Sequence, residues 1–472
     1  MNRRPSGSRV LVTLMIAAAT AAFWACAAEP TTTPRTPPHV LIIVADDLGW
    51  QDVGFQGCKD IPTPHLDRLA AQGVIFDDAH VTASVCAPSR TGFTLGRYQQ
   101  REGCEGNGRA GQGMPIDDVR TFPKVMQQAG YQTHCLGKWH LGQDEGRHPL
   151  DQGYDHFSGF LAGSRSYWPL PRANTARALQ RDRSRIDESE VTYLTDWLSD
   201  EACRRILARD PARPMMIVLN YNAPHTPMHA REEDLQRFAG IANQRRRTYA
   251  AMVWRMDQGI GRILATLDEQ RIANDTIVVF FSDNGGATNN ASDNGPWRGM
   301  KGSKWEGGHR VPFVMRWPGR LHPRHYDKPI VTFDLMPTCL AAAGQPVPTW
   351  ADGVDLLPYL GGAKDTEPHK TLYWRRMAAA ALREGRWKLV RVDQEDGKGH
   401  DWHLIDLKAN PDETKDVRSA NPDVLAYLQA RMVQWESHMR TPLWREGERW
   451  ERNQRYKHRM DTLGRDMERR FP

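Results

Sequence analysis

Short, wholly apolar runs alternate along this sequence with longer segments that carry apolar residues at helical spacing. Residues 40–44 read Val-Leu-Ile-Ile-Val, and residues 276–281 read Thr-Ile-Val-Val-Phe-Phe. A strand without polar alternation is typical of a sheet whose two faces are both covered. Strands that alternate with helices in this way predict an α/β fold, in which a large, mainly parallel sheet is sandwiched by helices.

The alternation divides the chain into two predicted domains. The chain has 472 residues, which is more than the roughly 250–300 residues at which a single hydrophobic core stops growing. We predict a catalytic domain at 39–365 and a smaller C-terminal α+β domain with an antiparallel sheet at 366–472. The predicted strands are 40–44, 74–76, 131–136, 215–220, 276–281, 371–374, 380–383, 387–391 and 403–406, and the predicted helices are 64–73, 119–129, 189–209, 246–270 and 422–435.

The N-terminus has the three-part form of a secretory signal peptide. Arg3, Arg4 and Arg9 precede an apolar run at 10–25, and small residues follow it around Cys26. The run is shorter than the roughly twenty residues of a membrane span, so no stable membrane span is expected. We predict a signal peptide at 1–28, a disordered Thr- and Pro-rich lead-in at 29–38, and export to the periplasm or the medium. Lipid attachment at Cys26 is the less favoured alternative.

The charge balance gives no indication of a nucleic-acid partner. The chain has 63 Lys and Arg residues against 57 Asp and Glu residues, a formal net charge of +6. Arginines gather in the last forty residues, but acids are interleaved with them. This pattern favours a solvated, salt-bridged helix over a polyanion site. We therefore predict an Arg-rich helical tail and no nucleic acid among the partners.

Acidic and amide side chains follow two of the predicted strands. Asp46 and Asp47 follow the first strand, and Asp283 and Asn284 follow the strand at 276–281. Ligands in open parallel sheets bind beyond the carboxyl ends of the strands, and oxygen ligands suit a hard cation such as Ca²⁺ or Mg²⁺. A single Asp at a strand end is more often a cap or a turn residue, but two occurrences favour a metal site. The similar segment 293–295 follows no strand and is interpreted as a loop that faces the substrate.

One cysteine stands apart from the other six. Cys86 lies in the segment Ser-Val-Cys-Ala-Pro-Ser-Arg-Thr-Gly, four residues before Arg90 at a helix start. That placement is consistent with a nucleophile whose thiolate is stabilised by a cation and by a helix dipole. A buried structural cysteine is the alternative, and the residues alone leave both open. No Cys-x-x-Cys pair occurs, and removing Cys26 and Cys86 leaves an odd five, which argues against complete disulfide pairing.

The segment around Cys86 resembles the signature of the sulfatases of the alkaline-phosphatase-like superfamily, in which Cys-x-Pro-x-Arg directs oxidation of the cysteine to formylglycine. The resemblance runs from about residue 38 to 420 and is closest to arylsulfatases and N-acetylgalactosamine-6-sulfatases. Further motifs occur in the family's order: Asp-Asp-Leu-Gly at 46–49, Gly-Lys-Trp-His at 137–140, Ala-Pro-His-Thr-Pro at 223–227, Phe-Ser-Asp-Asn-Gly at 281–285, Arg-Gly-Met-Lys-Gly at 298–302, Glu-Gly-Gly at 306–308 and Asn-Pro-Asp-Glu at 410–413.

The resemblance implies a cofactor and a modification. One Ca²⁺ ion would be held by residue 86 and by four further side chains, which are Asp46, Asp47, Asp283 and Asn284. A formylglycine-generating enzyme would convert Cys86 to formylglycine. The hydrated aldehyde would then attack the sulfur atom of a sulfate ester with help from Asp283.

The same resemblance implies roles for five further residues. Arg90 would steady the hydrate, and Lys138 and Lys301 would clamp the sulfate. His225 would protonate the leaving alcohol, and His140 would accept the proton that releases sulfate from the enzyme. Lys304, three residues after Lys301, is interpreted as solvated or substrate-facing.

The substrate class follows from weaker signals. The stretch 289–296 loosely resembles a loop of galactosamine-6-sulfate sulfatases, so a sulfated polysaccharide or glycosaminoglycan-type saccharide is the predicted substrate, with an aryl sulfate as a surrogate. A phosphonate or phosphodiester hydrolase of the same superfamily is the alternative, and a non-enzymatic binding protein is disfavoured because every motif residue is chemically competent. Candidate tryptophans for stacking on sugar rings, each more often a core residue, are Trp50, Trp139, Trp168, Trp297, Trp350 and Trp374.

Overall fold

The computed structural model describes residues 36–460, apart from 109–112, 116–119, 171, 173 and 396. Residues from Pro37 onward form one compact unit. The predicted signal peptide and nearly all of the predicted lead-in lie outside the described residues. No helix in the described part of the chain combines the length and the apolar character needed to cross a bilayer.

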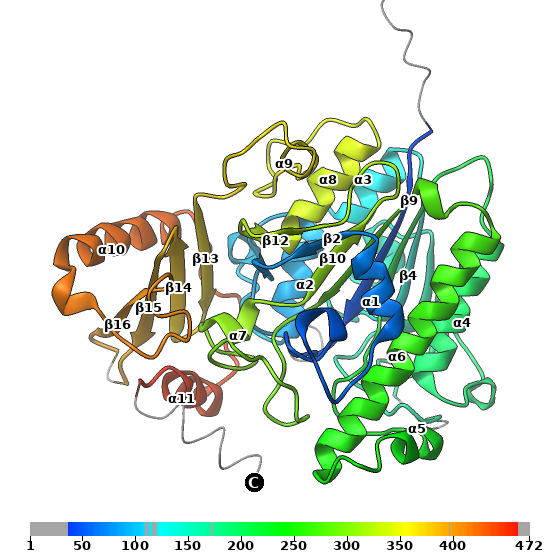
Figure 1. Ribbon diagram of the computed structural model, residues 1–472, viewed down its shortest axis with the longest axis horizontal. Helices are drawn as coiled ribbons and strands as arrows, with labels where there is room; N and C mark the ends of the chain where they lie inside the picture. The colour runs from blue at the N-terminus through cyan, green and yellow to red at the C-terminus, as the bar shows by residue number, and fades with distance from the viewer. Residues whose placement is uncertain are drawn as a thin grey trace, which may run out of the picture. The chain divides into compact units, whose positions relative to one another are not determined.

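A ten-stranded sheet forms the centre of the molecule (Figure 1). The five strands β9, β1, β8, β4 and β5 run parallel to one another, and antiparallel strands lie toward both edges. The predicted large, mainly parallel sheet is therefore confirmed. In spatial order the strands are β11 (Arg324–Tyr326), β2 (Val74–Phe76), β10 (Phe313–Arg316), β9 (Thr276–Ser282), β1 (His39–Ala45), β8 (Met215–Asn220), β4 (Gln132–Lys138), β5 (His156–Phe160), β6 (Gln180–Arg181) and β7 (Ser184–Arg185).

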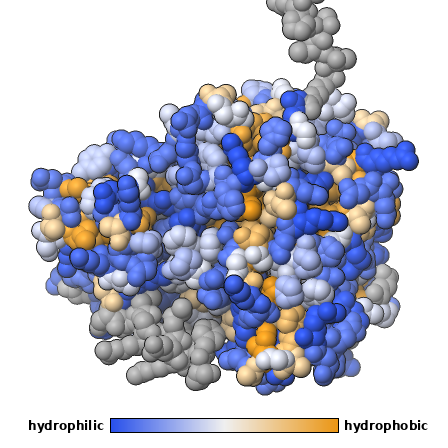
Figure 2. All heavy atoms as spheres, viewed as in Figure 1, coloured by the Kyte–Doolittle hydropathy of each residue, from blue (hydrophilic) through white to orange (hydrophobic). Residues whose placement is uncertain are grey.

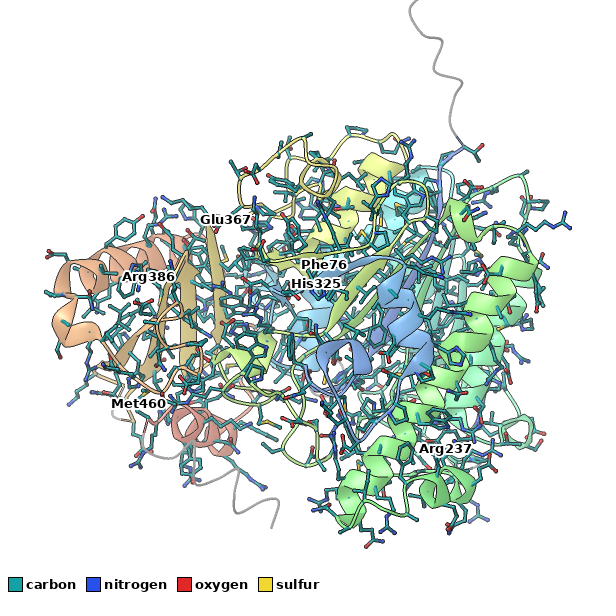
Figure 3. The ribbon with its side chains drawn as sticks, viewed as in Figure 1. Phe76, Arg237, His325, Glu367, Arg386 and Met460 are labelled. Carbon is teal, nitrogen blue, oxygen red and sulfur yellow. The ribbon has the colours of Figure 1, made fainter. Side chains whose placement is uncertain are left out.

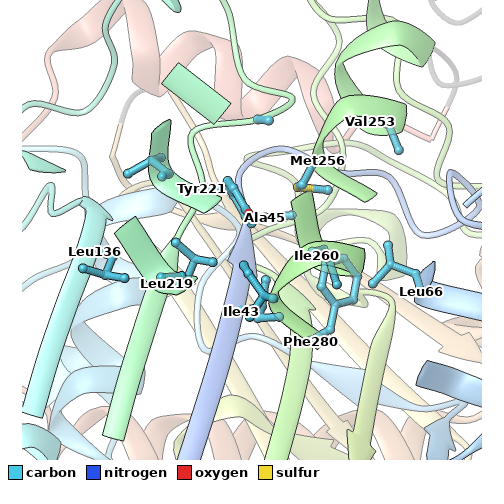
Figure 4. Packing of buried hydrophobic residues seen from close by; sticks show 14 of the residues in the cluster. Ile43, Ala45, Leu66, Leu136, Leu219, Tyr221, Val253, Met256, Ile260 and Phe280 are labelled. Atoms are coloured by element: carbon cyan, nitrogen blue, oxygen red, sulfur yellow. The ribbon is translucent and has the colours of Figure 1, made fainter. Parts of the chain in front are cut away.

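The apolar run at 40–44 is buried on both faces of this sheet, as its composition predicts. Leu41 and Ile43 belong to the hydrophobic cluster on one face, whereas Val40 and Ile42 belong to the cluster on the other. Figure 4 shows Ile43 beside Phe280 and Leu219 of the neighbouring strands. Alternating side chains of one strand thus fill two separate cores, which leaves no position for a polar residue.

Helices cover both faces. The helices whose side chains join the core of Ile43 are α1 (Pro64–Ala71), α4 (Leu194–Leu207), α5 (Glu232–Arg237) and α6 (Gln244–Glu269). The helices of the opposite core are α2 (Cys86–Leu95), α3 (Phe122–Gln128), α8 (Leu335–Ala342) and α9 (Leu357–Leu360). A short pair of strands, β3 (Ala79–His80) and β12 (Ile330–Val331), lies outside the main sheet.

Side chains within the sheet pack across neighbouring strands. Phe76 of β2 meets Phe313 of β10 edge to face, with ring centroids 5.0 Å apart, and His325 of β11 lies on the strand next to β2 (Figure 3). The face in Figure 2 is mainly hydrophilic, and its apolar patches are small.

A second, antiparallel sheet follows residue 370, as predicted. Its strands are β13 (Thr371–Arg376), β14 (Ala379–Glu384), β15 (Trp387–Asp393) and β16 (His400–Asp406), and its helix is α10 (Pro422–Glu436). Lys388 of β15 ties this sheet to α7 (Glu306–His309), because its buried Nζ lies 2.8 Å from both Glu306 Oε1 and Glu413 Oε1. The predicted domain boundary near residue 365 stays a prediction.

The predicted helix boundaries differ from the observed ones mainly at the N-terminal ends. The predicted helix at 189–209 begins instead at Leu194, because residues 188–190 form a separate 3₁₀ turn capped by Asp187. The helix predicted at 119–129 begins at Phe122, where Thr121 accepts a hydrogen bond from the Lys124 N–H. Side-chain caps of this kind fix where a helix can begin.

A buried acid at the start of α1 leads to a prediction about stability. Asp257 of α6 accepts the backbone N–H groups of Leu66 at 2.8 Å and of His65 at 3.3 Å. Burial nevertheless raises the pKa of Asp257 to about 7, from 3.8 for the ordinary carboxyl. In the folded protein this carboxyl keeps its proton where the unfolded chain has lost it. Its contribution to stability is therefore complete below pH ~4 and is lost as the pH rises through 7.

Between pH 5 and pH 7 the wild type should lose about 2 kcal/mol of unfolding free energy relative to Asp257→Asn, whose side chain does not titrate. Urea unfolding of both proteins at the two pH values measures the difference. Asp268→Asn, at an exposed position of the same helix, is the matched control; because it keeps Asp257, it should lose as much unfolding free energy as the wild type. Equal pH dependence of the wild type and Asp257→Asn would contradict the expectation.

Candidate active site

The acids predicted at the two strand ends lie side by side. β1 and β9 are parallel neighbours in which Ala45 lies opposite Ser282, so both strands end at the same edge of the sheet. The N–H of Asp47 lies 3.4 Å from Asp283 Oδ1, and Asn284 Nδ2 donates to Asp47 Oδ1 at 2.7 Å. Asp47 adopts a left-handed conformation with φ 64°, which turns the chain sharply after β1.

Cys86 is the first residue of α2 and lies beside these acids. All ten residues of α2 are buried, and Val85 before it is extended. The Sγ atom of Cys86 lies 2.9 Å from Lys301 Nζ, and the same ammonium group donates to Asp47 Oδ1 at 2.6 Å. One lysine therefore joins the cysteine to the acids of β1.

Two further cations pair with the remaining acids of the strand ends. Lys138, the last residue of β4, is fully buried and donates to Asp46 Oδ2 at 2.6 Å. Arg90, one helical turn after Cys86, donates from Nε to Asp283 Oδ2 at 2.8 Å and from Nη1 to Asn220 Oδ1 at 2.8 Å. The site thus brings together a thiol, three carboxylates and three cations.

These charges give Cys86 an acidity that no other described cysteine has. All six described cysteines are free thiols. Burial raises the pKa of the other five, to about 12 at four of them: Cys58, Cys104, Cys135 and Cys339, with Cys203 also raised. Burial acts in the same direction at Cys86, but the charges of Lys138 and Lys301 outweigh it and hold the pKa of Cys86 well below its usual value.

The two predicted histidines face Cys86 with opposite preferences for a proton. Burial lowers the pKa of His140 to about 4, although a hydrogen bond to Cys86 opposes the shift. Burial also acts to lower the pKa of His225, but the carboxylates of Asp46 and Asp47 outweigh it and raise that pKa. His225 Nε2 lies 3.6 Å from Asp47 Oδ2. His140 is therefore suited to accept a proton and His225 to donate one.

The donor set at the strand ends fits a hard cation. Ligand atoms of Asp46, Asp47, Cys86 and His225 all lie within 4.8 Å of one another. Asp46 Oδ1 and Asn284 Oδ1 are buried and have no hydrogen-bond partner among the described residues. Carboxylate and amide oxygens with unused lone pairs are the ligands that Ca²⁺ prefers. His225 was not among the predicted ligands, whereas Asp283 and Asn284 contact Asp47, as described above.

A pocket of about 580 Å³ opens onto this site. Asp47, His225 and Lys301 line it, together with Thr288 and Asn289. Seven further lining residues, which were not predicted, come from β13 and from the C-terminal tail: Arg376, Arg445, Glu446, Trp450, Asn453, Gln454 and Lys457. The helical spacing of the last four residues was the available signal.

The structure differs in part from three predictions about individual segments. Lys304 is buried instead of solvated, and its Nζ donates to Ser84 Oγ at 3.2 Å. Residues 293–295 form a loop, as predicted, but Asn294 within it is buried and its Oδ1 accepts the N–H of Gly286 at 2.8 Å. The tail helix α11 (Glu448–Lys457) is solvated on one face only, because Gln454 and the following His458 are buried against the protein.

Comparisons with known proteins agree with this geometry. The family model described as Sulfatase matches residues 38–345, and the model described as N-sulphoglucosamine sulphohydrolase, C-terminal, matches residues 301–438. Steryl-sulfatase of Mus musculus is 33% identical over 466 residues, which cover 79% of this chain and 73% of that protein. N-acetylgalactosamine-6-sulfatase of Canis lupus familiaris is 31% identical, with 75% of this chain and 71% of that protein covered.

A solved structure extends the similarity to three dimensions. The crystal structure of Ps i-CgsB in complex with k-i-k-neocarrahexaose superposes with a TM-score of 0.81 at 33% identity, and covers 89% of this chain and 98% of that one. The two family models together span both sheets and the residues at the strand ends. The chain belongs to the sulfatase family and is a sulfuric ester hydrolase.

Proposed function

We propose that the protein hydrolyses sulfate esters of carbohydrates, with formylglycine made from Cys86 as the nucleophile and with one Ca²⁺ ion in the site. The observation that carries the proposal is the convergence of two lysine ammonium groups and an oxygen-rich donor set on the first residue of α2. A sulfate group carries its charge on several oxygens, so it needs several cationic partners at once.

Asp46, Asp47, Asp283 and Asn284, with residue 86, would hold the calcium ion. When bound, the ion neutralises sulfate oxygens and makes the sulfur atom more electrophilic. The unpartnered oxygens of Asp46 and Asn284 support this assignment. At position 86 the hydrated aldehyde supplies the hydroxyl group that attacks sulfur.

The cations of the chain would prepare the sulfate for attack. Lys301 lies within hydrogen-bond distance of both Asp47 and Cys86, so its ammonium group reaches the position of the reacting atoms. Lys138 brings a second positive charge to Cys86 from the C-terminal end of β4. Arg90 holds the Asp283 carboxylate through its Nε and thereby orients the acid that would assist deprotonation of the nucleophile.

The histidines would move the protons. His225 lies on the pocket lining and would donate a proton to the oxygen of the leaving sugar. His140, whose Nδ1 is buried without a hydrogen-bond partner among the described residues, would accept a proton from residue 86 when sulfate is released. The pKa directions of the two groups support this division of roles.

The pocket lining supports a carbohydrate substrate over a steroid. Most of the lining side chains are polar or charged, and Val85, Ala287 and Trp450 are the apolar ones on the described lining. Hydroxyl-rich sugars match such a surface, whereas an apolar ring system leaves its polar groups unpaired. Two similar proteins also support a carbohydrate substrate: one is named N-acetylgalactosamine-6-sulfatase, and the other is Ps i-CgsB in complex with k-i-k-neocarrahexaose.

A substrate panel tests the proposal. Protein made together with a formylglycine-generating enzyme should release sulfate from p-nitrophenyl sulfate and, with higher kcat/KM, from sulfated oligosaccharides of carrageenan or chondroitin. Activity confined to phenolic or steroid sulfates would contradict the carbohydrate assignment. Faster turnover of p-nitrophenyl phosphate than of p-nitrophenyl sulfate would favour a phosphonate or phosphodiester hydrolase instead.

The role of His225 predicts a dependence on the leaving group. His225→Asn should lower kcat/KM for a sugar sulfate by about 10²-fold, but for p-nitrophenyl sulfate by less than about tenfold, because nitrophenolate leaves without a proton. His229→Asn changes a half-buried histidine outside the pocket lining and serves as the matched control. Equal losses of His225→Asn on both substrates would show that His225 is not the general acid.

We also propose that residues 1–28 direct export and are removed. The order of basic, apolar and small residues supports this role. N-terminal sequencing of protein recovered from the periplasm or the medium should find a first residue near Glu29. An intact N-terminus at Met1, or a lipid on Cys26, would contradict cleavage at this point.

A further inference from the structure

The tail helix α11 lines the active-site pocket together with His225 and Lys301. Trp450, Asn453, Gln454 and Lys457 of the tail line the pocket, and their spacing of three and four residues places them on one helical face. A segment far from the catalytic motifs in sequence therefore borders the space that a substrate must enter.

This wall is attached to the catalytic loop. Lys457 Nζ donates to the carbonyl oxygen of Lys301 at 2.7 Å, and Trp305 Nε1 donates to the carbonyl oxygen of Lys457 at 3.1 Å. The N–H of Lys304 donates to His458 Nε2 at 2.7 Å. These contacts fix the position of α11 relative to the lysine that reaches Cys86.

The segment before α11 is fixed on the other side of the pocket. Glu446 forms an ion pair with Arg376 of β13 at 2.5 Å and accepts the N–H of Asn107 at 2.9 Å. Because Arg376 takes up the charge of Glu446, this acid does not repel an anionic ligand. The neighbouring Arg445 therefore lies next to a residue whose side chain is held by these two contacts.

The side chains that this wall offers to the pocket suit a sugar. Trp450 is 52% exposed although it is a large apolar residue. The side chain of Arg445 is 77% exposed, and its Nη1 lies 3.3 Å from Glu451 Oε1. Asn453 is also exposed. An indole face packs against the C–H groups of a pyranose ring, an amide pairs with hydroxyl groups, and a guanidinium group binds a sulfate in two-point fashion.

The position of these groups determines which part of a substrate they would touch. The ester that is cleaved must lie at Cys86, beside Lys301 on the pocket floor. Trp450 and Arg445 line the same pocket, but among the described residues neither forms a hydrogen bond or an ion pair with Cys86 or Lys301. They are therefore placed to meet a second sugar unit while the first occupies the floor.

We propose that Trp450, Asn453 and Arg445 form a subsite for a neighbouring, sulfated sugar unit, so that the preferred substrate is an oligosaccharide with sulfates on adjacent units. This inference rests on the proposed function, since it assigns the substrate of the same pocket. Binding energy from such a remote unit is gained equally in the ground state and the transition state, so its loss raises KM and leaves kcat nearly unchanged.

Trp450→Ala and Arg445→Gln test the subsite with two substrates. On a sulfated carrageenan or chondroitin tetrasaccharide, each variant should lower kcat/KM about tenfold or more, through KM. On p-nitrophenyl sulfate, which has no second unit, both should equal the wild type. Trp450→Phe should retain most of the activity on the tetrasaccharide. Arg452→Gln, at an exposed position of α11 outside the pocket lining, is the matched control.

The outcomes separate this inference from the proposed function. A wild type that hydrolyses no sulfate ester overturns the proposed function and the subsite with it. A wild type that cleaves p-nitrophenyl sulfate but none of the tetrasaccharides overturns the subsite. Variants that match the wild type on the tetrasaccharide also overturn it. Equal losses on both substrates also overturn it, because they would show that α11 only holds the Lys301 loop in place.

Discussion

Cys86→Ala is expected to lower kcat/KM for sulfate esters by at least about 10⁴-fold while the protein stays folded. Removing the residue that forms the covalent intermediate costs on the order of 10⁶-fold in well-studied hydrolases, and binding and electrostatic groups retain a residual part. Lys138, Lys301 and the strand-end acids would all remain, but nothing would be left at the start of α2 to attack sulfur. Initial rates with p-nitrophenyl sulfate measure the loss.

The matched control for this change is Cys203→Ala. Cys203 is half-buried in α4, and burial raises the pKa of its thiol. The Cys203→Ala variant should therefore retain wild-type turnover. Thermal unfolding of both variants separates chemistry from folding, since a Cys86→Ala protein with a wild-type Tm has lost only the nucleophile. Turnover within tenfold of the wild type would show that Cys86 is not the residue that attacks sulfur.

Lys301→Met is expected to lower kcat by about 10²–10³-fold, which is typical for removal of one preorganised charge that stabilises a transition state. Its ammonium group is the only described cation whose Nζ lies within 3 Å of both a strand-end acid and Cys86. Without this ammonium group, the described side chains that still contact the Asp47 carboxylate are Asn284 and His225. Steady-state kinetics on p-nitrophenyl sulfate give the loss in kcat.

Lys304→Met gives a matched control in the same loop. Burial and the neighbouring charge of Arg376 hold the pKa of Lys304 well below its usual value. Its Nζ contacts Ser84 Oγ and not Cys86. Activity should therefore stay within about threefold of the wild type. If Lys304→Met lost as much kcat as Lys301→Met, the effect would belong to the loop and not to the ammonium group of Lys301.

The sequence could predict the sheet because burial on both faces makes its strands apolar. It could predict the acids at the edge of the sheet because they directly follow two such strands. A strand such as 40–44 must be apolar throughout when helices cover both faces, and this character is visible without any partner. The parallel arrangement then places Asp46 and Asp283 at one edge whatever the details of packing. The predicted grouping of these acids with Cys86, Lys138 and Lys301 needed the family resemblance in addition.

The sequence could not predict which residues of the tail face the pocket. The spacing of Trp450, Asn453 and Lys457 defines a helical face, but the partner of that face is set by contacts with residues 301–305. The interleaved charges of the tail favour a solvated helix, and that interpretation holds for one face only. Lys304 was misplaced for the same reason, because its burial depends on Ser84 and on His458.

The most direct test of the mechanism is the mass of the peptide that contains residue 86, measured on protein whose sulfatase activity has been established. Conversion of Cys86 to formylglycine replaces the sulfur atom, the S–H hydrogen and one Cβ hydrogen of the side chain with one oxygen. We expect the aldehyde or its hydrate in proportion to specific activity across preparations. A fully active protein whose residue 86 is an unmodified thiol would contradict the proposed nucleophile.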